Sequence, residues 1–160
     1  MRLLLSLTSA IVLTALLASA IAPAPDHLQF RAVLSGDAEV PAVETDTRGT
    51  FKIRFAEDYS SAEFQVNLRN AERITQAHIH FAAEGENGPV MLFLTGFHDR
   101  GWDIPSGPYA RATLTNDNII STDGGATLEE IADTFRAGNA YVNVHSLANP
   151  GGEVRGQIRD

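Results

Sequence analysis

The chain has 160 residues, with 12 basic against 20 acidic side chains and a formal net charge of −8 when histidine is neutral. An acidic chain without a run of basic residues is a poor candidate for a nucleic-acid-binding protein. Cysteine is absent, which excludes disulfides, a cysteine-ligated structural zinc and a blue-copper site with a thiolate ligand. Any metal site must therefore use nitrogen and oxygen ligands.

The first twenty residues have the pattern of a secretory signal peptide. A basic residue, Arg2, is followed by an apolar run to about Leu17 and by a small-residue cleavage site ending at Ala20. Pro23 and Pro25 follow without a basic stop-transfer flank, so no membrane span is expected in the mature form. We expect a secreted or periplasmic protein after cleavage near Ala20, with residues 21–29 as a linker and 30–160 as one domain.

The dominant period of the remaining chain is two, which is typical of half-buried strands. The pattern predicts an all-β antiparallel sandwich or barrel of about eight strands, with turns at 69–72 and 85–89 and a long irregular stretch at 96–108. The predicted strands are 30–34, 50–55, 63–68, 74–81, 90–94, 109–114, 140–145 and 153–158.

One short helix is predicted at about 128–137. Thr127 is the expected N-cap, with Glu130 reaching back to complete a capping box, and Gly138 is the expected stop. Such a helix would cover one end or edge of the sandwich.

The histidines carry the most specific chemistry. In a strand, His78 and His80 project from the same side, roughly 6 to 7 Å apart, and metal–nitrogen bonds are only about 2 Å long. His145 lies on a second predicted strand, with Asn143 on the same face. If the two strands are neighbours, the three imidazoles converge on one ion.

Imidazole suits copper and zinc, and copper is preferred because it generally binds more tightly. His98, in the irregular stretch, is the candidate fourth ligand, and Asn143 is a candidate to hydrogen-bond a ligand histidine and fix its tautomer. The alternative is that the histidines are structural, as outward polar residues of half-buried strands. Glu153 and Arg155 would share a strand face and could pair or brace the end of the sheet, which is favoured over a catalytic role.

Four ordered motifs resemble the CHRD domain, the module named after chordin, over Phe30 to about Arg159. They suggest a single-domain exported member of the kind found in bacteria, where the biochemical role is largely unassigned. The cysteine-rich modules of chordin are lacking, so growth-factor binding does not follow from the resemblance. The motifs are Phe30-x-Ala32-x-Leu34-Ser35-Gly36-x-x-Glu39-Val40-Pro41, Ala77-His78-Ile79-His80 with Gly85-x-Asn87-Gly88-Pro89-Val90, Tyr141 to His145, and Asn149 to Ile158.

Three functions are therefore considered. The first is binding of copper or zinc by His78, His80 and His145. The second is an extracellular or envelope protein-interaction module with structural histidines. The third is redox activity, because a His-x-His strand with a distant histidine is similar to the copper site of copper/zinc superoxide dismutases. No cysteine pair or convincing bridging histidine supports that enzyme, and no nucleophile elbow or phosphate loop is present, so a non-enzymatic role is favoured.

Overall fold

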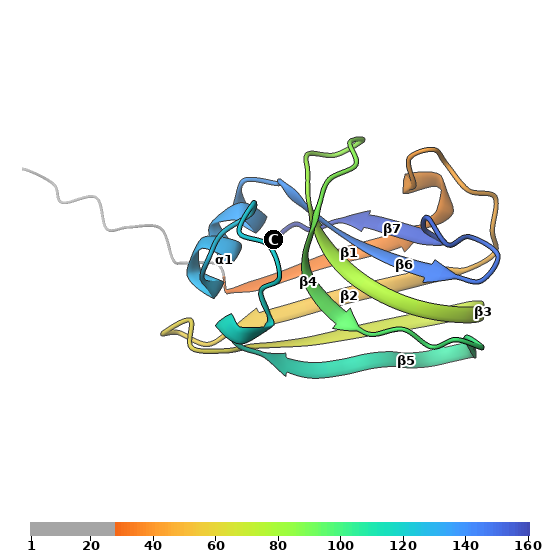
Figure 1. Cartoon of the computed structure of the whole chain (residues 1–160), viewed down its shortest axis with the longest axis horizontal. Helices are drawn as coiled ribbons and strands as arrows, with labels where there is room; N and C mark the ends of the chain where they lie inside the picture. Colours follow the sequence, from red (N-terminus) through yellow and green to blue (C-terminus); the bar gives the residue numbers. More distant parts are fainter. Residues whose placement is uncertain (1–27) are drawn as a thin grey trace, which may run out of the picture.

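Alternating burial along the chain builds the strands, as the period of two predicts. The computed structural model describes residues 28–160, and in β1 (Gln29–Ser35) every second side chain is buried while its neighbours face solvent. The other described elements are β2 (Arg48–Phe55), β3 (Ala62–Phe81), β4 (Val90–Thr95), β5 (Trp102–Leu114), α1 (Leu128–Arg136), β6 (Ala140–Ser146), β7 (Val154–Gln157) and two short 3-10 turns, η1 (Gly36–Ala38) and η2 (Asn116–Asn118) (Figure 1).

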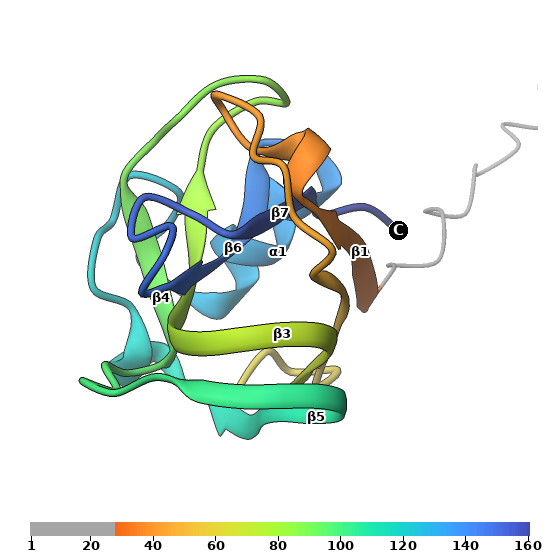
Figure 2. The ribbon, with the colours of Figure 1, turned by 90° about the vertical axis from the view of Figure 1, so that its right-hand side faces the viewer.

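The seven described strands are all paired antiparallel, and the pairing closes on itself. The order along the sheet is β2-β1-β7-β6-β3-β4, and β2 also pairs with β3, so β1, β7, β6, β3 and β2 form a ring. β5 pairs with β3 outside this ring, and the two strands run side by side in Figures 1 and 2. The fold is thus the expected all-β antiparallel barrel with one helix, built from seven strands.

β3 is the longest element and belongs to both halves of the barrel. Its first half pairs with β2 and β5, and its second half pairs with β4 and β6. Between the halves, Asn70 and Arg73 have φ of 51° and 50°, and the register with β5 shifts between Ala71 and Ile74. The irregular segment bends the strand, which turns at the right-hand end of the molecule in Figure 1.

The bend explains why the sequence predicts one strand too many. The predicted strands 63–68 and 74–81 are the two halves of β3, and the predicted turn at 69–72 is the bulged segment between them. Backbone pairing with β5 continues past the bulge, so no chain reversal occurs. The predicted irregular stretch 96–108 is also partly wrong, because β5 begins at Trp102 and includes Pro105 and Pro108.

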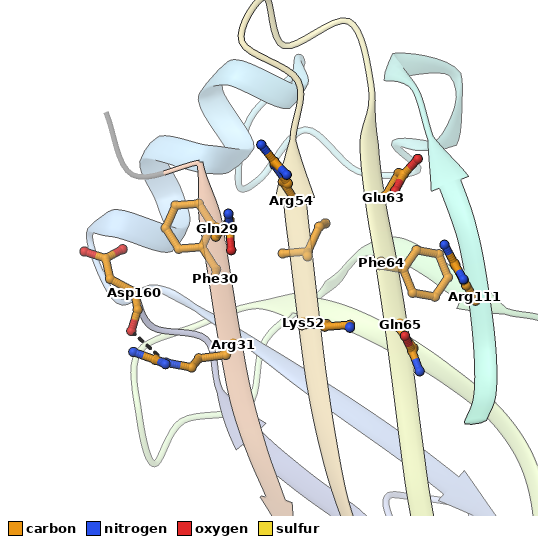
Figure 3. A pocket seen from close by; sticks show the side chains of 11 residues that line it. Gln29, Phe30, Arg31, Lys52, Arg54, Glu63, Phe64, Gln65, Arg111 and Asp160 are labelled. Atoms are coloured by element: carbon orange, nitrogen blue, oxygen red, sulfur yellow. Dashed lines mark hydrogen bonds between the residues drawn. The ribbon is translucent and has the colours of Figure 1, made fainter. Parts of the chain in front are cut away.

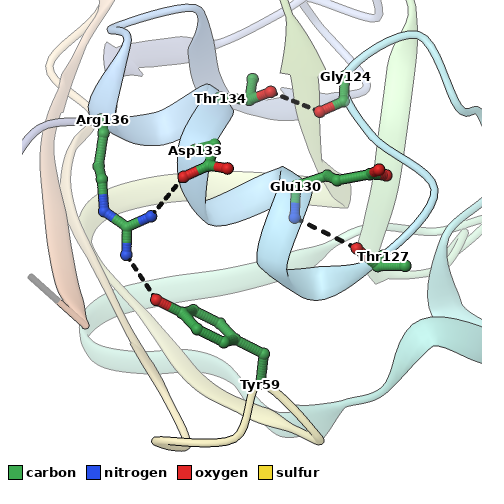
Figure 4. Close-up of polar contacts among 7 residues, drawn as sticks. All are labelled: Tyr59, Gly124, Thr127, Glu130, Asp133, Thr134 and Arg136. Atoms are coloured by element: carbon green, nitrogen blue, oxygen red, sulfur yellow. Dashed lines mark hydrogen bonds and ion pairs between the residues drawn. The ribbon is translucent and has the colours of Figure 1, made fainter. Parts of the chain in front are cut away.

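The helix forms where capping signals predicted it and closes one end of the barrel. The Thr127 side chain accepts a hydrogen bond from the Glu130 backbone N–H at 3.3 Å (Figure 4). The Glu130 carboxylate reaches back to the Ala126 N–H at 2.6 Å, one residue before the N-cap position that a capping box predicts. After α1, Gly138 has φ of 71°, a left-handed conformation that ends helices.

Helix α1 is fastened to the barrel by aromatic packing and by Arg136. Phe135 packs edge-on against Phe30 and Phe55, with ring centroids 5.4 and 5.8 Å apart. Burying one such side chain stabilises the fold by about 1.5–3 kcal/mol. Arg136 donates to Asp133 at 2.6 Å and to the Tyr59 hydroxyl at 2.7 Å, which links the helix to the β2–β3 turn (Figure 4).

The predicted signal peptide at 1–20 and most of the predicted linker at 21–29 lie outside the described residues. Within the described part, β1 already starts at Gln29. No helix among residues 28–160 has the length and apolarity that crossing a membrane requires.

Candidate metal centre

Pairing of β3 with β6 brings the three predicted histidines together. His78 lies opposite Asn143, and Gln76 lies opposite His145, so the two histidine strands are direct neighbours. Side chains of the same parity on paired strands share a face. Ala77 and Ile79 face the core on the other side and are fully buried. The adjacency that the sequence could only assume is confirmed.

The imidazole nitrogens form one compact group. One nitrogen from each of His78, His80 and His145 lies within 4.8 Å of the others. The shortest contact joins His78 Nδ1 to His145 Nε2 at 3.1 Å. Among the described residues, no carboxylate joins this group, so the site offers three neutral nitrogen ligands.

Backbone carbonyls determine the tautomers of two of the rings. His80 Nδ1 lies 2.9 Å from the Gly88 carbonyl, and His145 Nδ1 lies 2.9 Å from the Pro150 carbonyl. A carbonyl oxygen only accepts, so both Nδ1 atoms donate and both Nε2 atoms carry a lone pair. The Nε2 atoms of His78 and His80 are buried without a hydrogen-bond partner. A buried lone pair without a hydrogen-bond partner costs free energy unless a donor or a metal ion binds it.

Burial keeps the three imidazoles in their neutral, ligating form. Desolvation lowers the pKa of His78 to about 3, with smaller contributions from His145 and His80. Desolvation also lowers the pKa of His80 and of His145, in each case against a backbone hydrogen bond that favours the charged form. At neutral pH all three rings are therefore unprotonated at one nitrogen and available to a metal.

The spacing fits a metal ion with a modest side-chain adjustment. With metal–nitrogen bonds of about 2.0–2.1 Å, two tetrahedral ligands lie roughly 3.3 Å apart and two opposite ligands roughly 4.2 Å apart. The contact of 3.1 Å between His78 and His145 is close to the tetrahedral value. The outer spacing of 4.8 Å is wider than either, so closure needs a side-chain shift on the order of 1 Å. His80, the half-buried ring of the three, is the one that would shift, and its contacts with the Gly88 carbonyl and the Tyr141 ring would have to adjust with it.

Aromatic rings line the site on two sides. Phe93 of β4 packs edge-on against His78, with ring centroids 4.4 Å apart. Tyr141 of β6 stacks on His80 at 4.7 Å and 10°. The Arg155 guanidinium lies 3.4 Å from the centre of the Tyr141 ring, on a side chain that is 2% exposed. Tyr141 is thus in contact with both His80 and a buried cation.

Arg155 also holds the loop that touches His80. Its guanidinium donates to the Glu86 carbonyl at 2.7 Å and to Asn87 Oδ1 at 3.1 Å. The next residue in this loop, Gly88, accepts from His80, so the loop and the ligand ring are positioned together. Of the two roles considered for Glu153 and Arg155, pairing is absent from the described contacts, because Glu153 is hydrogen-bonded by Asn149, Ser146, Thr47 and Thr45.

The structure does not bring His98 into the group. Its ring stacks on Trp102 with centroids 3.8 Å apart, and its backbone N–H donates to the Thr75 carbonyl. β5 begins at Trp102, which pairs with Ile74 of β3. His98 lies in the connection just before this pair and bonds the next residue of β3. The candidate fourth ligand is therefore a stacking residue of this connection, outside the cluster of three.

Asn143 shares the face of the histidines but bonds elsewhere. Its Nδ2 donates to Glu39 Oε1 at 2.7 Å, and its Oδ1 has no partner. The predicted hydrogen bond from Asn143 to a ligand histidine is absent from the described contacts. Gly152 packs against the Asn143 amide and the Glu39 carboxylate. A Cβ at this position would lie 2.5 Å from Glu39 Oε1, and its φ of 151° also favours glycine.

Glu39 is one of three residues near the site that the sequence pattern did not identify as site residues. Burial raises its pKa to about 7, although Arg155 lowers it and Glu153 raises it further. Nothing in its local pattern indicates this place, because it reaches the face from the segment after β1, 104 residues away from Asn143. Tyr141 and Arg155 were also missed, but they share strand parity with Asn143 in the pairing of β6 with β7 and could have been found that way.

Comparison with known proteins agrees with the motifs. The CHRD domain family model matches residues 30–158. The chain therefore belongs to the CHRD domain family, a class that fits an extracellular or envelope module. No curated protein matches this chain.

Proposed function

We propose that this CHRD domain binds a copper or zinc ion through His78, His80 and His145. The observation that carries the proposal is the convergence of three neutral imidazoles within 4.8 Å. Two of them present buried nitrogens that lack any hydrogen-bond partner. Carbonyl acceptors at Gly88 and Pro150 orient two of the rings with Nε2 toward the group, which is the arrangement that outer hydrogen bonds give to metal-ligating histidines.

The ligand set narrows the ion. Three imidazole nitrogens without a carboxylate suit copper and zinc and are a poor match for magnesium or calcium, which prefer oxygen. Copper is favoured by its higher general affinity for nitrogen sites. Three protein ligands also leave a coordination position open for a small ligand or for transfer. We propose sequestration, transfer or redox protection in an exported, secreted or periplasmic protein as the role.

The test is metal content. The protein, purified without a histidine tag, is incubated with copper or zinc, dialysed against a mild chelator and analysed by mass spectrometry. We expect close to one equivalent of metal in the parent and none in the His78→Ala/His80→Ala variant. His98→Ala is the matched control and should keep the metal. If the double variant retained metal like the parent, the proposed site would be wrong.

An alternative function is a protein-interaction module with structural histidines. The specific observation in its favour is a set of exposed aromatic side chains on and after β4: Phe93 is 43%, Phe97 is 67% and Trp102 is 52% exposed. Exposed aromatic residues are enriched in protein interfaces. A parent protein that takes up neither copper nor zinc, while remaining folded, would favour this alternative.

A further inference from the structure

A second feature involves the first half of β3, whereas His78 and His80 lie on its second half. The stretches 29–35, 48–55, 62–69 and 106–114 form the paired strand segments of one outer sheet face. Within them, basic residues outnumber acidic residues by six to one, in a chain where acidic residues predominate overall. The six cations are Arg31, Arg48, Lys52, Arg54, Arg69 and Arg111, and the one carboxylate is Glu63. We call this surface the cationic face.

The strand register gathers these charges into rows. Arg31 lies opposite Lys52, Lys52 lies opposite Gln65, and Gln65 lies opposite Arg111, so one row crosses β1, β2, β3 and β5. Neighbouring strands are about 4.8 Å apart, which makes this row roughly 14 Å long. Figure 3 shows the four side chains on adjacent strands. They come from widely separated parts of the sequence, which is why no basic run announces them.

Five of these six cations have no carboxylate opposite them on a paired strand, whereas Arg54 lies opposite Glu63. The two ion pairs recorded within residues 28–160 are Arg136 with Asp133 and Arg159 with Glu84, and neither involves the cationic face. Arg31 Nε donates to the main-chain oxygen of Asp160 at 3.2 Å, so this acidic residue lies beside Arg31 at the edge of the face (Figure 3).

Like charges even face each other directly on this surface. Arg31 opposes Lys52, and Arg48 opposes Arg69. Like charges directly opposite on paired strands destabilise a sheet. A local arrangement that costs stability is expected where function requires it.

The surface is hollowed and polar rather than apolar. One hollow of about 660 Å³ is lined by four cations, Arg31, Lys52, Arg54 and Arg111, and by two acidic residues, Glu63 and Asp160. A second hollow of about 460 Å³ is lined by Arg48, Arg69 and their neighbours, with no acidic residue. Between the cations lie neutral donors and acceptors such as Gln29, Gln65, Thr50 and Asn67. Val33 is the one large hydrophobic side chain of the described residues that is exposed on this face.

We propose that the cationic face binds an extended acidic polysaccharide. The cations would bind its carboxylate or sulfate groups, and the interspersed amides and hydroxyls would hydrogen-bond sugar hydroxyls. The face lacks exposed aromatic rings on which unpaired bases stack, and Val33 is its one exposed large apolar side chain, too little for insertion into a membrane. The remaining surface is strongly acidic and repels bulky polyanions, so a thin chain that touches this face alone is the best match.

The test is a binding titration of the purified protein with oligogalacturonate, a linear sugar chain with a carboxylate on every unit. An uncharged dextran oligosaccharide of similar length is the matched ligand control. We expect binding to the acidic chain that weakens with added salt, and none to dextran. Lys52→Gln and Arg111→Gln should each weaken binding by about three- to tenfold. Arg100→Gln removes one exposed charge outside the face and should leave the affinity unchanged.

Thermal unfolding shows whether the variants remain folded, and their melting temperatures should equal or exceed that of the parent, since like-charge repulsion is relieved. Equal weakening by Arg100→Gln would overturn the proposal, as would comparable binding to dextran. Tighter binding to single-stranded DNA, or to vesicles of phosphatidylglycerol, would assign the face to another class of partner. Self-association that Lys52→Gln abolishes would assign it to a second copy of the chain.

Discussion

His78 Nδ1 lies 3.1 Å from His145 Nε2, although 67 residues separate the two histidines in the chain. Because His145 Nδ1 already donates to the Pro150 carbonyl, its Nε2 is an acceptor and His78 Nδ1 provides the proton between them. If the proton of His78 moved from Nδ1 to Nε2, an ion in its place would meet two nitrogens almost at coordination spacing. The contact therefore defines the position from which a metal site can be built with the least rearrangement.

Metal binding should stabilise the folded protein. A ligand that binds only the native state adds about 2.7 kcal/mol at a concentration one hundred times its dissociation constant. We expect copper or zinc to raise the melting temperature of the parent and of His98→Ala. The melting temperature of His78→Ala/His80→Ala should be the same with and without metal. Calorimetry with and without metal measures this. An equal rise in the double variant would place the binding elsewhere.

Tyr141 should act as a positioning residue for His80. Tyr141→Leu removes the ring that contacts both His80 and Arg155. Losing a residue that orients a metal ligand typically lowers metal affinity by about 10- to 100-fold, and we expect a fall of roughly tenfold here. Tyr141→Phe keeps the stacked ring and loses only the hydroxyl that accepts from Gly88, so it should stay near the parent value. Competition titration against a chromophoric chelator gives both numbers, and equal affinities in all three proteins would contradict the role.

Glu39 should make stability depend on pH between about 4.5 and 7. Its folded pKa of about 7 lies above the ordinary value of 4.5, so the folded state binds its proton more tightly. The stabilisation is complete below pH 4.5 and is lost as the pH rises through 7. Glu39→Gln removes this loss and retains an acceptor for Asn143. We therefore expect the free energy of unfolding of Glu39→Gln, relative to that of the parent, to be higher at pH 8 than at pH 5. Urea unfolding of both proteins at the two pH values measures this, and a difference that does not change with pH would contradict the prediction.

Glu153 should have the opposite pH dependence. Burial opposes its ionisation, but hydrogen bonds from Asn149, Thr45, Ser146 and Thr47 outweigh burial and lower the pKa. Its contribution is present above the unfolded value of 4.5 and is lost as the pH falls through the lower folded value. Glu153→Gln should cost on the order of 3 kcal/mol at pH 7, because its amide turns a donor toward other donors.

The cost of Glu153→Gln should shrink below pH 4.5, because the unfolded parent then binds a proton at Glu153 and the stabilisation from the ionised folded carboxylate is progressively lost. Urea unfolding of both proteins at pH 7 and pH 3.5 measures the difference. A cost that is independent of pH would mean that the charge of Glu153 contributes little.

The N-cap of α1 should be worth about 1 kcal/mol. Thr127→Ala removes the acceptor of the Glu130 N–H, whereas Thr127→Asp keeps an acceptor and adds a favourable negative charge at the helix start. Chemical unfolding should rank the aspartate variant with the parent and the alanine variant below both. If alanine were neutral, Glu130 with Ala126 would be the contact that matters at this helix start.

Residues with a local signal were predicted well, and residues that depend on long-range pairing were not. The alternation of Phe51, Ile53 and Phe55 indicates a strand because burial follows strand parity, and the cap of α1 is visible in four consecutive residues. The histidine site was predicted as three residues, since each strand displays its own pattern. That β3 and β6 are neighbours, by contrast, is a property of the whole sheet.

The site's surroundings show the same division. Glu39 reaches Asn143 across the fold from the segment after β1, and Thr45 and Thr47 reach Glu153 from the same region. No periodicity specifies such contacts. The cationic face was missed for a related reason: its charges lie at alternate positions on separate strands, and only the register of β1, β2, β3 and β5 makes them neighbours.

The bulge in β3 determines which side chains of its second half face the core. Before it, the even-numbered residues Phe64, Val66 and Leu68 are buried, whereas beyond it the odd-numbered Ala77 and Ile79 face the core. The segment around Asn70 and Arg73 thus acts like a frameshift within a single strand. If the strand kept strict alternation through this segment without losing a residue, the even-numbered His78 and His80 would share the buried face of Phe64, Val66 and Leu68, and both imidazoles would have to enter the hydrophobic interior. The irregular backbone of this segment, rather than the sequence pattern of either half of β3, therefore decides that the histidines lie on the face opposite the core.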